Sequence, residues 1–208
     1  MAINFPTSLD NFANHTDGTT VLTAAILNEI RDAVDALEAK LGADGSVVVS
    51  SHDYKLAHQK LVQIVNTQSG SFIDCDTVMP WDDSIPQNTE GDEVMTLAVT
   101  PSNAANILKI EVVVQYGIQA LNNHCLAALF QDSTAASPAC GIGGQSNYYY
   151  SARGTIMFTH WMTAGTTSNT TFKVRLGASA GGVGFNGTTS RIGGGVASSS
   201  ITITELNP

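Results

Sequence analysis

Positive charge is scarce in this chain, whose 208 residues include 9 Lys and Arg against 18 Asp and Glu, for a formal net charge of −9. Only 13% of the residues are charged at all. Proteins that bind nucleic acid or anionic lipid need clustered Lys and Arg on one face. The composition therefore argues against a nucleic-acid partner and against insertion into or docking on a membrane.

Long apolar runs and cysteines are also lacking. No apolar stretch approaches 18 residues, and residues 1–6 have neither a basic region nor an apolar core, so we expect no transmembrane span and no secretory signal. Cys75, Cys125 and Cys140 are odd in number and match no metal or redox spacing, which indicates synthesis in a reducing compartment. A disulfide between Cys125 and Cys140 stays open as an alternative.

Catalytic motifs are missing as well. No Gly-x-Ser-x-Gly or His-Glu-x-x-His sequence occurs, and no pair of carboxylates stands out. The glycine-rich segments 140–144 and 193–195 are not followed by a helix, so they are predicted to be turns rather than phosphate cradles. The sequence predicts no catalytic residue, no cofactor and no enzymatic activity.

Two groups of residues raise the question of a metal. His124, Cys125, Cys140 and His160 are soft-metal ligand types, but strand alternation alone would turn Cys125 inward and His124 outward, so we predict no metal there. The segment 74–93 holds seven carboxylates and no Lys or Arg, and calcium prefers oxygen ligands. No EF-hand or comparable spacing is present, so a solvated acidic loop is predicted and calcium is the alternative. The carboxylates are Asp74, Asp76, Asp82, Asp83, Glu90, Asp92 and Glu93.

Residues 21–42 have the pattern of a helix that cannot bury its apolar side alone. Polar residues and alanines separate the apolar positions, and Gly42 ends the pattern. Two and a half heptads are too short for a stable free helix, so the rest of the chain or other copies must cover the seam. The pattern suits a trimer or a tetramer, and we predict a homotrimer. Its seam residues, at intervals of 3, 4, 3 and 4, are Leu27, Ile30, Val34, Leu37 and Leu41.

Beyond about residue 55 the apolar residues alternate with a period of two, which predicts strands. Turn-forming residues separate these runs, and no helical period lies between them, which is typical of an antiparallel β-sandwich or jelly roll of about eight strands. We therefore expect a mainly β protein with an arm at 1–20, a trimerisation helix at 21–42, a linker at 43–59 and a sandwich head at 60–208. The clearest runs are 94–100, 107–117, 124–131, 155–163, 171–176 and 200–204.

Two loops are candidates for receptor binding. Tyr148, Tyr149 and Tyr150 are consecutive in the polar loop 144–152, so at least one ring faces solvent, where amphipathic rings favour recognition, including stacking on sugars. The alternative is a tyrosine-rich edge that packs on the next strand. The second candidate is the glycine-rich loop 177–189 around Phe185 and Asn186, because loops carry variable binding chemistry.

The arm at 1–20 is polar except for Phe5, Leu9 and Phe12, which a segment lying on a partner surface would explain. Read together, residues 4–42 resemble the N-terminal segment of bacteriophage tail-fibre, head-fibre and related virion appendage proteins. The matching phrases are Phe-Pro-Thr-Ser-Leu-Asp-Asn-Phe at 5–12 and Ala-Val-Asp-Ala-Leu-Glu-Ala-Lys-Leu-Gly at 33–42. In that family the segment attaches the appendage to the particle and starts a three-fold assembly.

The resemblance implies a non-enzymatic virion structural protein, made in the host cytoplasm and bound to capsid or tail proteins of the particle. Its head would bind a glycan of the host surface. One alternative is a decoration protein that only stabilises the capsid. Another, from a different class, is an enzyme that degrades host polysaccharide, although such tips are usually much larger with a long binding groove. An unrelated soluble sandwich is the last alternative.

Overall fold

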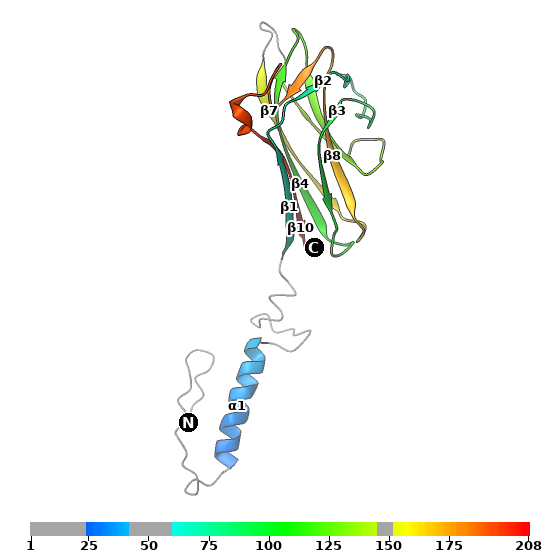
Figure 1. Cartoon of the computed structure of the whole chain (residues 1–208). Coiled ribbons are helices and arrows are strands. Elements are labelled where there is room, and N and C mark those ends of the chain that lie inside the picture. The colour runs from blue at the N-terminus through cyan, green and yellow to red at the C-terminus, as the bar shows by residue number, and fades with distance from the viewer. Residues whose placement is uncertain (1–23, 42–59, 145–151) are drawn as a thin grey trace. The chain divides into compact units, whose positions relative to one another are not determined.

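The structure is a computed structural model that describes residues 24–41, 60–144 and 152–208. One helix, α1 (Ala24–Leu41), precedes a compact β unit, Lys60–Pro208, which we call the head (Figure 1). A short 3₁₀ turn, η1 (Gly193–Gly195), interrupts the head. Its strands are β1 (Leu61–Ser69), β2 (Ile73–Cys75), β3 (Asp92–Val99), β4 (Ile107–Ile118), β5 (Cys125–Gln131), β6 (Ala139–Ile142), β7 (Arg153–Thr163), β8 (Thr170–Ala178), β9 (Val183–Phe185) and β10 (Ser199–Leu206).

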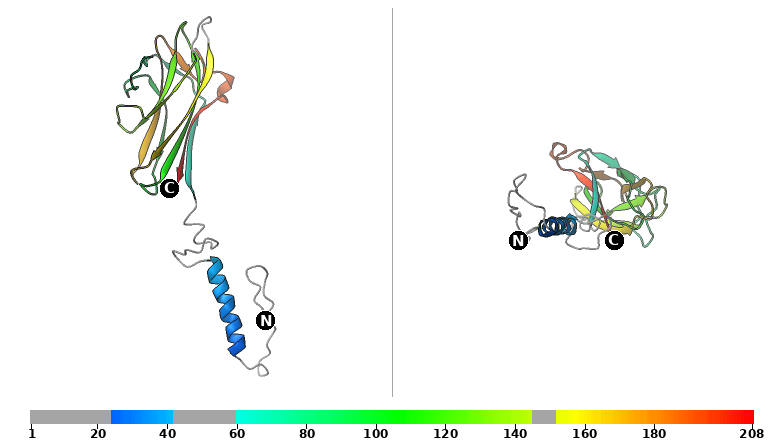
Figure 2. Two further views of the ribbon diagram at one scale, coloured as in Figure 1. Left: turned by 180° about the vertical axis from the view of Figure 1, so that it is seen from behind. Right: turned by 90° about the horizontal axis from the view of Figure 1, so that it is seen from below.

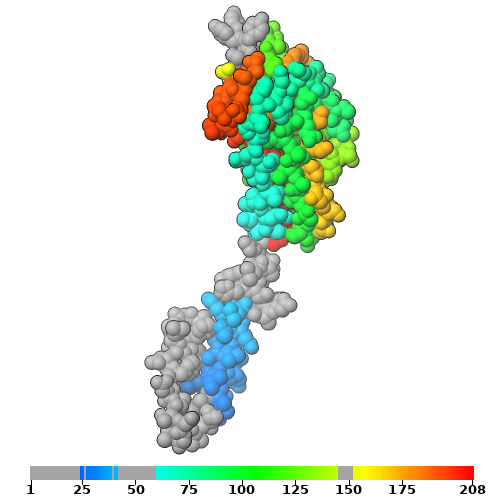
Figure 3. All heavy atoms as spheres, in the orientation of Figure 1, coloured from blue at the N-terminus to red at the C-terminus, as the bar shows by residue number. Residues whose placement is uncertain are grey.

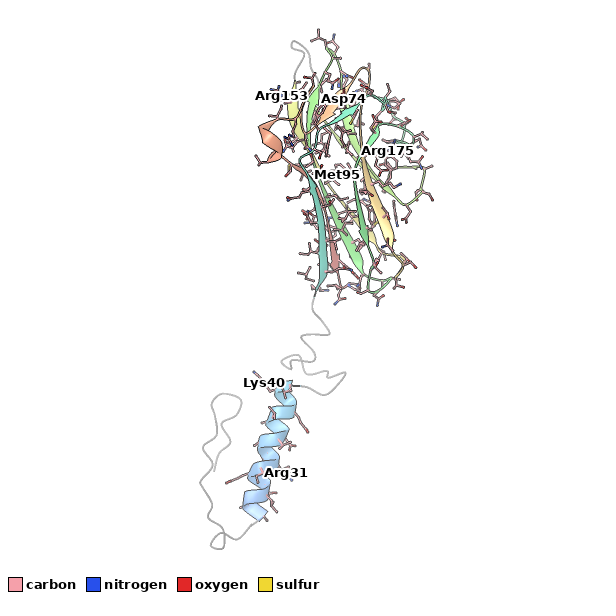
Figure 4. All side chains as sticks on the ribbon, viewed as in Figure 1. Arg31, Lys40, Asp74, Met95, Arg153 and Arg175 are labelled. Atoms are coloured by element: carbon pink, nitrogen blue, oxygen red, sulfur yellow. The ribbon has the colours of Figure 1, made fainter. Side chains whose placement is uncertain are left out.

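Helix α1 confirms the helix expected from the heptad spacing. Lys40 lies in its last turn, where a positive charge interacts favourably with the helix dipole (Figure 4). Arg31 contacts Asp32 at 3.3 Å and Asp35, one turn on, at 4.0 Å. An exposed pair one turn apart, such as Arg31 with Asp35, stabilises a helix by only about 0.3–0.5 kcal/mol. Packing of the apolar seam therefore has to supply most of the helix's stability.

The head is a sandwich of two antiparallel sheets (Figures 1 and 2). The larger has the strand order β1-β10-β4-β9-β2, and β7 pairs with the other edge of β4. The smaller has the order β3-β8-β5-β6. This arrangement confirms the predicted mainly β, jelly-roll-like sandwich.

The core lies between the sheets and follows from the period of two. In β4, Leu108, Ile110, Val112 and Val114 are buried while the residues between them are half-buried. A fully buried Leu, Ile or Phe contributes roughly 1.5–3 kcal/mol by leaving water. The facing residues from the smaller sheet include Leu129, Phe172, Val174 and Leu176.

A second apolar cluster lies on the outer side of the smaller sheet, where Met79 covers Leu126, Ala128 and Phe130 of β5. Strand β5 is thus buried on both faces, which explains why its sequence is continuously apolar. Arg175 of β8 holds the covering segment in place, since its guanidinium donates to the carbonyl oxygens of Glu90 at 2.8 Å and Gly91 at 2.6 Å (Figure 4).

The strand registers define two ends of the head. Leu61, Leu206, Ile107 and Thr163 form one row across β1, β10, β4 and β7, and we call this end the base. Strand β4 runs from the base to Ile118 at the opposite end, which we call the far end. The chain therefore enters the head at its base, and the loops that follow β4 and β8 lie at the far end.

Candidate functional surfaces

Helix α1 leaves its apolar seam open. The five seam side chains, at positions 27, 30, 34, 37 and 41, are 43–55% exposed. A helix that exposes a stripe of Leu, Ile and Val to water is missing a partner surface. The residues predicted to form a trimer interface are therefore available for one.

The head has an exposed sheet face as well, on the outer side of the larger sheet. Side chains paired across neighbouring strands point to the same side, and four rows of them cross this sheet. The rows, in the strand order β1, β10, β4 and β7, are Leu61, Leu206, Ile107 and Thr163; Ile64, Thr204, Lys109 and Trp161; Asn66, Thr202, Glu111 and Thr159; and Gln68, Ser200, Val113 and Met157.

Large apolar side chains gather at the base of this face. Leu61, Val62, Ile64 and Trp161, which we call the base patch, are 36–58% exposed. The ammonium group of Lys109 lies over the Trp161 ring, 5.7 Å from its centroid, and pairs with Glu111 at 2.8 Å. Figure 3 shows β1, in cyan, open at the surface of the head.

An aromatic pair lies at the far end of the head. The rings of Trp81 and His124 stack with centroids 4.2 Å apart and an angle of 14° between their planes. Trp81 remains 43% exposed, so part of its indole ring is open to solvent beside the stacked imidazole. Sequence reasoning missed this pair because the two residues are distant in the chain and no local pattern links them.

Phe185 and Asn186, predicted to bind a receptor, are buried, so that prediction is wrong for them. Phe185 belongs to the core as part of β9. The amide of Asn186 donates to the carbonyl oxygens of Ser69 at 2.7 Å and Ser71 at 2.9 Å, and its oxygen accepts from the Ser199 hydroxyl. Asn186 has a φ of 56°, as expected for an Asn-Gly turn, but its side chain ties the turn to distant backbone.

The other candidates lie outside the described residues. These are Tyr148, Tyr149 and Tyr150 of the predicted receptor loop, and Phe5, Leu9 and Phe12 of the predicted attachment arm.

The cysteines and histidines considered as metal ligands differ in how deeply they are buried. Cys125 is buried and Cys140 exposed, and both are free thiols, as is the buried Cys75. Burial raises the pKa of the Cys75 and Cys125 thiols to about 12. Burial also lowers the pKa of the half-buried His160. Within residues 24–41, 60–144 and 152–208 no three His, Cys, Asp or Glu side chains come together as a metal site.

Two carboxylates of the acidic segment 74–93 accept hydrogen bonds from nearby residues of the same segment. Asp92 accepts from the backbone N–H of Thr77 at 2.9 Å and from its hydroxyl at 2.8 Å. Asp82 accepts from the Ser84 N–H at 2.8 Å and from its hydroxyl, and these bonds lower its pKa. These bonds shape the loop.

The surface of the head also has hollows. One of about 270 Å³ is lined by residues of β4 and β7 and by the segment after β9, including Gln115, Arg153 and Asn186. Another of about 380 Å³ lies between residues 82–86 and 137–140. Arg153 is held at the first hollow by a 3.1 Å bond to the Thr188 hydroxyl.

Comparisons with protein families and with curated protein sequences find no match for this chain. Among solved structures, Eiger TNF from S. frugiperda is 10% identical with a TM-score of 0.41, over 70% of this chain and 94% of that one. VP2 of the infectious bursal disease virus subviral particle is 8% identical, with a TM-score of 0.35, over 70% of this chain and 40% of that one. Latent PorU from Porphyromonas gingivalis is 9% identical, with a TM-score of 0.32, over 71% of this chain and 13% of that one. We draw no function from these similarities.

The described part of the chain contains no helix of the length and apolar character needed to cross a membrane.

Proposed function

We propose that this protein is a non-enzymatic structural protein of a bacteriophage virion, a short homotrimeric fibre. Its N-terminal arm, with Phe5, Leu9 and Phe12, attaches it to capsid or tail proteins. Helix α1 joins three copies, and the sandwich head faces the host surface.

The exposed seam of α1 carries this proposal. Five apolar side chains at heptad spacing, each at least 43% exposed, need a cover, and copies of the same helix provide one with matching shape. The resemblance of residues 4–42 to virion appendage segments supports the same assembly and adds the particle as the partner.

Recognition of a host glycan belongs to the far end of the head, opposite the base at which the chain enters. The Trp81–His124 stack supports this role, because an exposed ring beside polar side chains suits stacking on a sugar. Three copies on one axis would raise a weak affinity through effective concentration, so no deep pocket is needed. The predicted Tyr148–Tyr150 loop remains a second candidate.

The oligomeric state of the full chain tests the assembly. Light scattering after size exclusion at micromolar concentration should give three times the chain mass of 21.8 kDa. Leu37→Asp should dissociate the trimer, because it places three carboxylates in an apolar seam. Asn28→Asp is the matched control, since it adds the same charge to the same helix outside the seam and should leave the trimer intact. A monomeric wild-type chain would overturn the proposal.

The place of the protein on the particle is tested separately. Antibodies against the head, with gold labels, should mark capsid or tail in electron micrographs of phage particles that contain the protein. Trp81→Ala particles should adsorb less to host cells while they assemble normally. If adsorption is unchanged and the particles instead lose heat resistance, the protein stabilises the capsid and has no receptor role.

A further inference from the structure

The head exposes an apolar sheet surface that the sandwich itself does not use. We propose that the outer face of the larger sheet, with the base patch at one end of it, is a second contact surface between copies of this chain. Three heads would meet through β1, β10, β4 and β7. This inference rests on the trimer proposed above and adds a contact that the helix alone does not require.

The side chains on this face are unusual for a sheet surface in water. The solvent side of an antiparallel sheet is normally polar, yet Ile64 is 58%, Trp161 54% and Met157 71% exposed. The first two lie in one row across the four strands, together with Thr204 and Lys109. Aromatic residues and Met are enriched in protein interfaces, so the composition points to a protein partner.

The charge of the face suits a second copy of the same acidic chain. Across the four rows of paired residues the charged side chains are Lys109 and Glu111, which neutralise each other at 2.8 Å. The carboxylates of segment 74–93 lie on other elements, β2, β3 and the loop between them. Two copies with a net charge of −9 repel each other. A neutral face is where they can approach with the least repulsion.

The polar groups of the face can also be buried without losing their hydrogen bonds. Asn66 already donates to the Thr202 hydroxyl at 2.8 Å and to the Ile201 carbonyl oxygen at 3.1 Å. Thr159 and Thr204 carry hydroxyl groups, which can donate or accept as a partner requires. Desolvation would also strengthen the contact of Lys109 with the Trp161 ring.

The size of the face explains why the contact needs the helix. Four strands about 4.8 Å apart and six residues at about 3.4 Å each cover roughly 400 Å². A stable interface buries about 800 Å² per partner, so separate heads should not associate at micromolar concentration. The base patch begins at Leu61, and only residues 42–60 connect it to the seam of the helix. A helical trimer would therefore tether three such faces at a high effective concentration. The partners that best suit this face are therefore other copies of the chain joined at α1.

Trp161 provides a direct probe in the full chain. In a Trp81→Phe variant it is the only tryptophan, since the sequence has two. Acrylamide quenching of its fluorescence should rise by at least about two-fold when Leu37→Asp breaks the trimer, because the ring leaves a dry interface for water. The reciprocal variant, Trp161→Phe, reports Trp81 at the far end, whose quenching should not change.

A second measurement uses a charge on the face. In the trimer, Ile64→Glu should lower the midpoint of thermal unfolding, because three carboxylates enter the contact. In the Leu37→Asp monomer the same substitution should lower the midpoint much less, since Ile64 is then mostly in water. The matched control is Ile85→Glu, which changes a side chain of similar exposure, 60%, in the loop after β2 and should be silent in both states.

The outcomes separate this inference from the proposed function. A wild-type chain that is monomeric overturns both. A trimer in which Trp161 is quenched as strongly as in the monomer leaves the helical assembly standing and overturns the head contact. A trimer in which Trp161 becomes protected only on phage particles also overturns it, because the occupant is then a virion protein.

Discussion

Glu205 provides the most quantitative prediction, because it is a buried carboxylate without a cationic partner among the described residues. The Ser102 backbone N–H and hydroxyl each donate to it at 2.8 Å, Asn106 donates at 2.5 Å, and Gln63 donates to its other oxygen. Burial would raise the pKa of Glu205, but the hydrogen bonds from Gln63, Asn106 and Ser102 outweigh it and hold the pKa below its ordinary value of 4.5.

A Glu205→Gln variant tests how much these bonds contribute. A hydrogen bond to a charged group is worth about 1 kcal/mol more than a neutral one, so the variant weakens four bonds. Because the variant no longer buries a charge, part of that loss is recovered. We therefore expect the free energy of unfolding to fall by about 2–3 kcal/mol at pH 7. Because the folded pKa is the lower one, this stability is fully present above the ordinary pKa and is lost as the pH falls through the folded pKa. The gap between wild type and variant should therefore narrow as the pH falls below the ordinary pKa of 4.5.

Urea unfolding at one protein concentration measures the difference in unfolding free energy between wild type and variant, at neutral and at acidic pH. The matched control is Glu93→Gln, whose exposed pair with Lys173, at 3.6 Å, should be worth less than about 1 kcal/mol. Equal losses for Glu205→Gln at both pH values would refute the reasoning, since the effect would then come from shape and not from charge.

Three further predictions follow from burial. Cys140 alone should react with a thiol reagent in the native protein, and Cys75 and Cys125 only after unfolding; three fast thiols would contradict their burial. Asn186→Ala should lower the free energy of unfolding by about 2–4 kcal/mol, because its buried partners lose their hydrogen bonds, and it should leave host adsorption unchanged. A stable variant with reduced adsorption would show that Asn186 contacts the receptor after all. Gly184→Ala should lower the unfolding midpoint, because its Cβ would meet the Thr188 carbonyl oxygen; an unchanged midpoint would argue against that close approach.

Local patterns in the sequence predicted the long strands and the helix. In β4 and β10, apolar residues alternate with polar ones because one face is buried and the other open, and this period can be read without a structure. The same holds for the 3-4 spacing of α1. Of the long strands, β1 was not among the runs identified from the sequence. Strands β2, β6 and β9 were missed because three or four residues are too few to show a period.

Long-range contacts could not be read from the sequence. Asn186 looked like a surface turn residue, and only the approach of the Ser69 and Ser71 carbonyls explains its burial. The Trp81–His124 stack and the base patch likewise need the fold, because each joins strands or loops that are far apart in the chain.

The position of β10 in the larger sheet governs the order in which the head folds. Strand β1 comes first in the head, yet its sheet partner is β10, the last strand in sequence, which also joins it to β4. During synthesis β1 therefore waits with its edge unpaired until β10 has left the ribosome, whereas α1 precedes both. Pairings of such long sequence separation form slowly, while helix contacts form fast. In the trimer proposed above, nascent chains would join at the helix before their heads are complete, and the unpaired β1 would be the segment most exposed to wrong pairing between neighbouring chains.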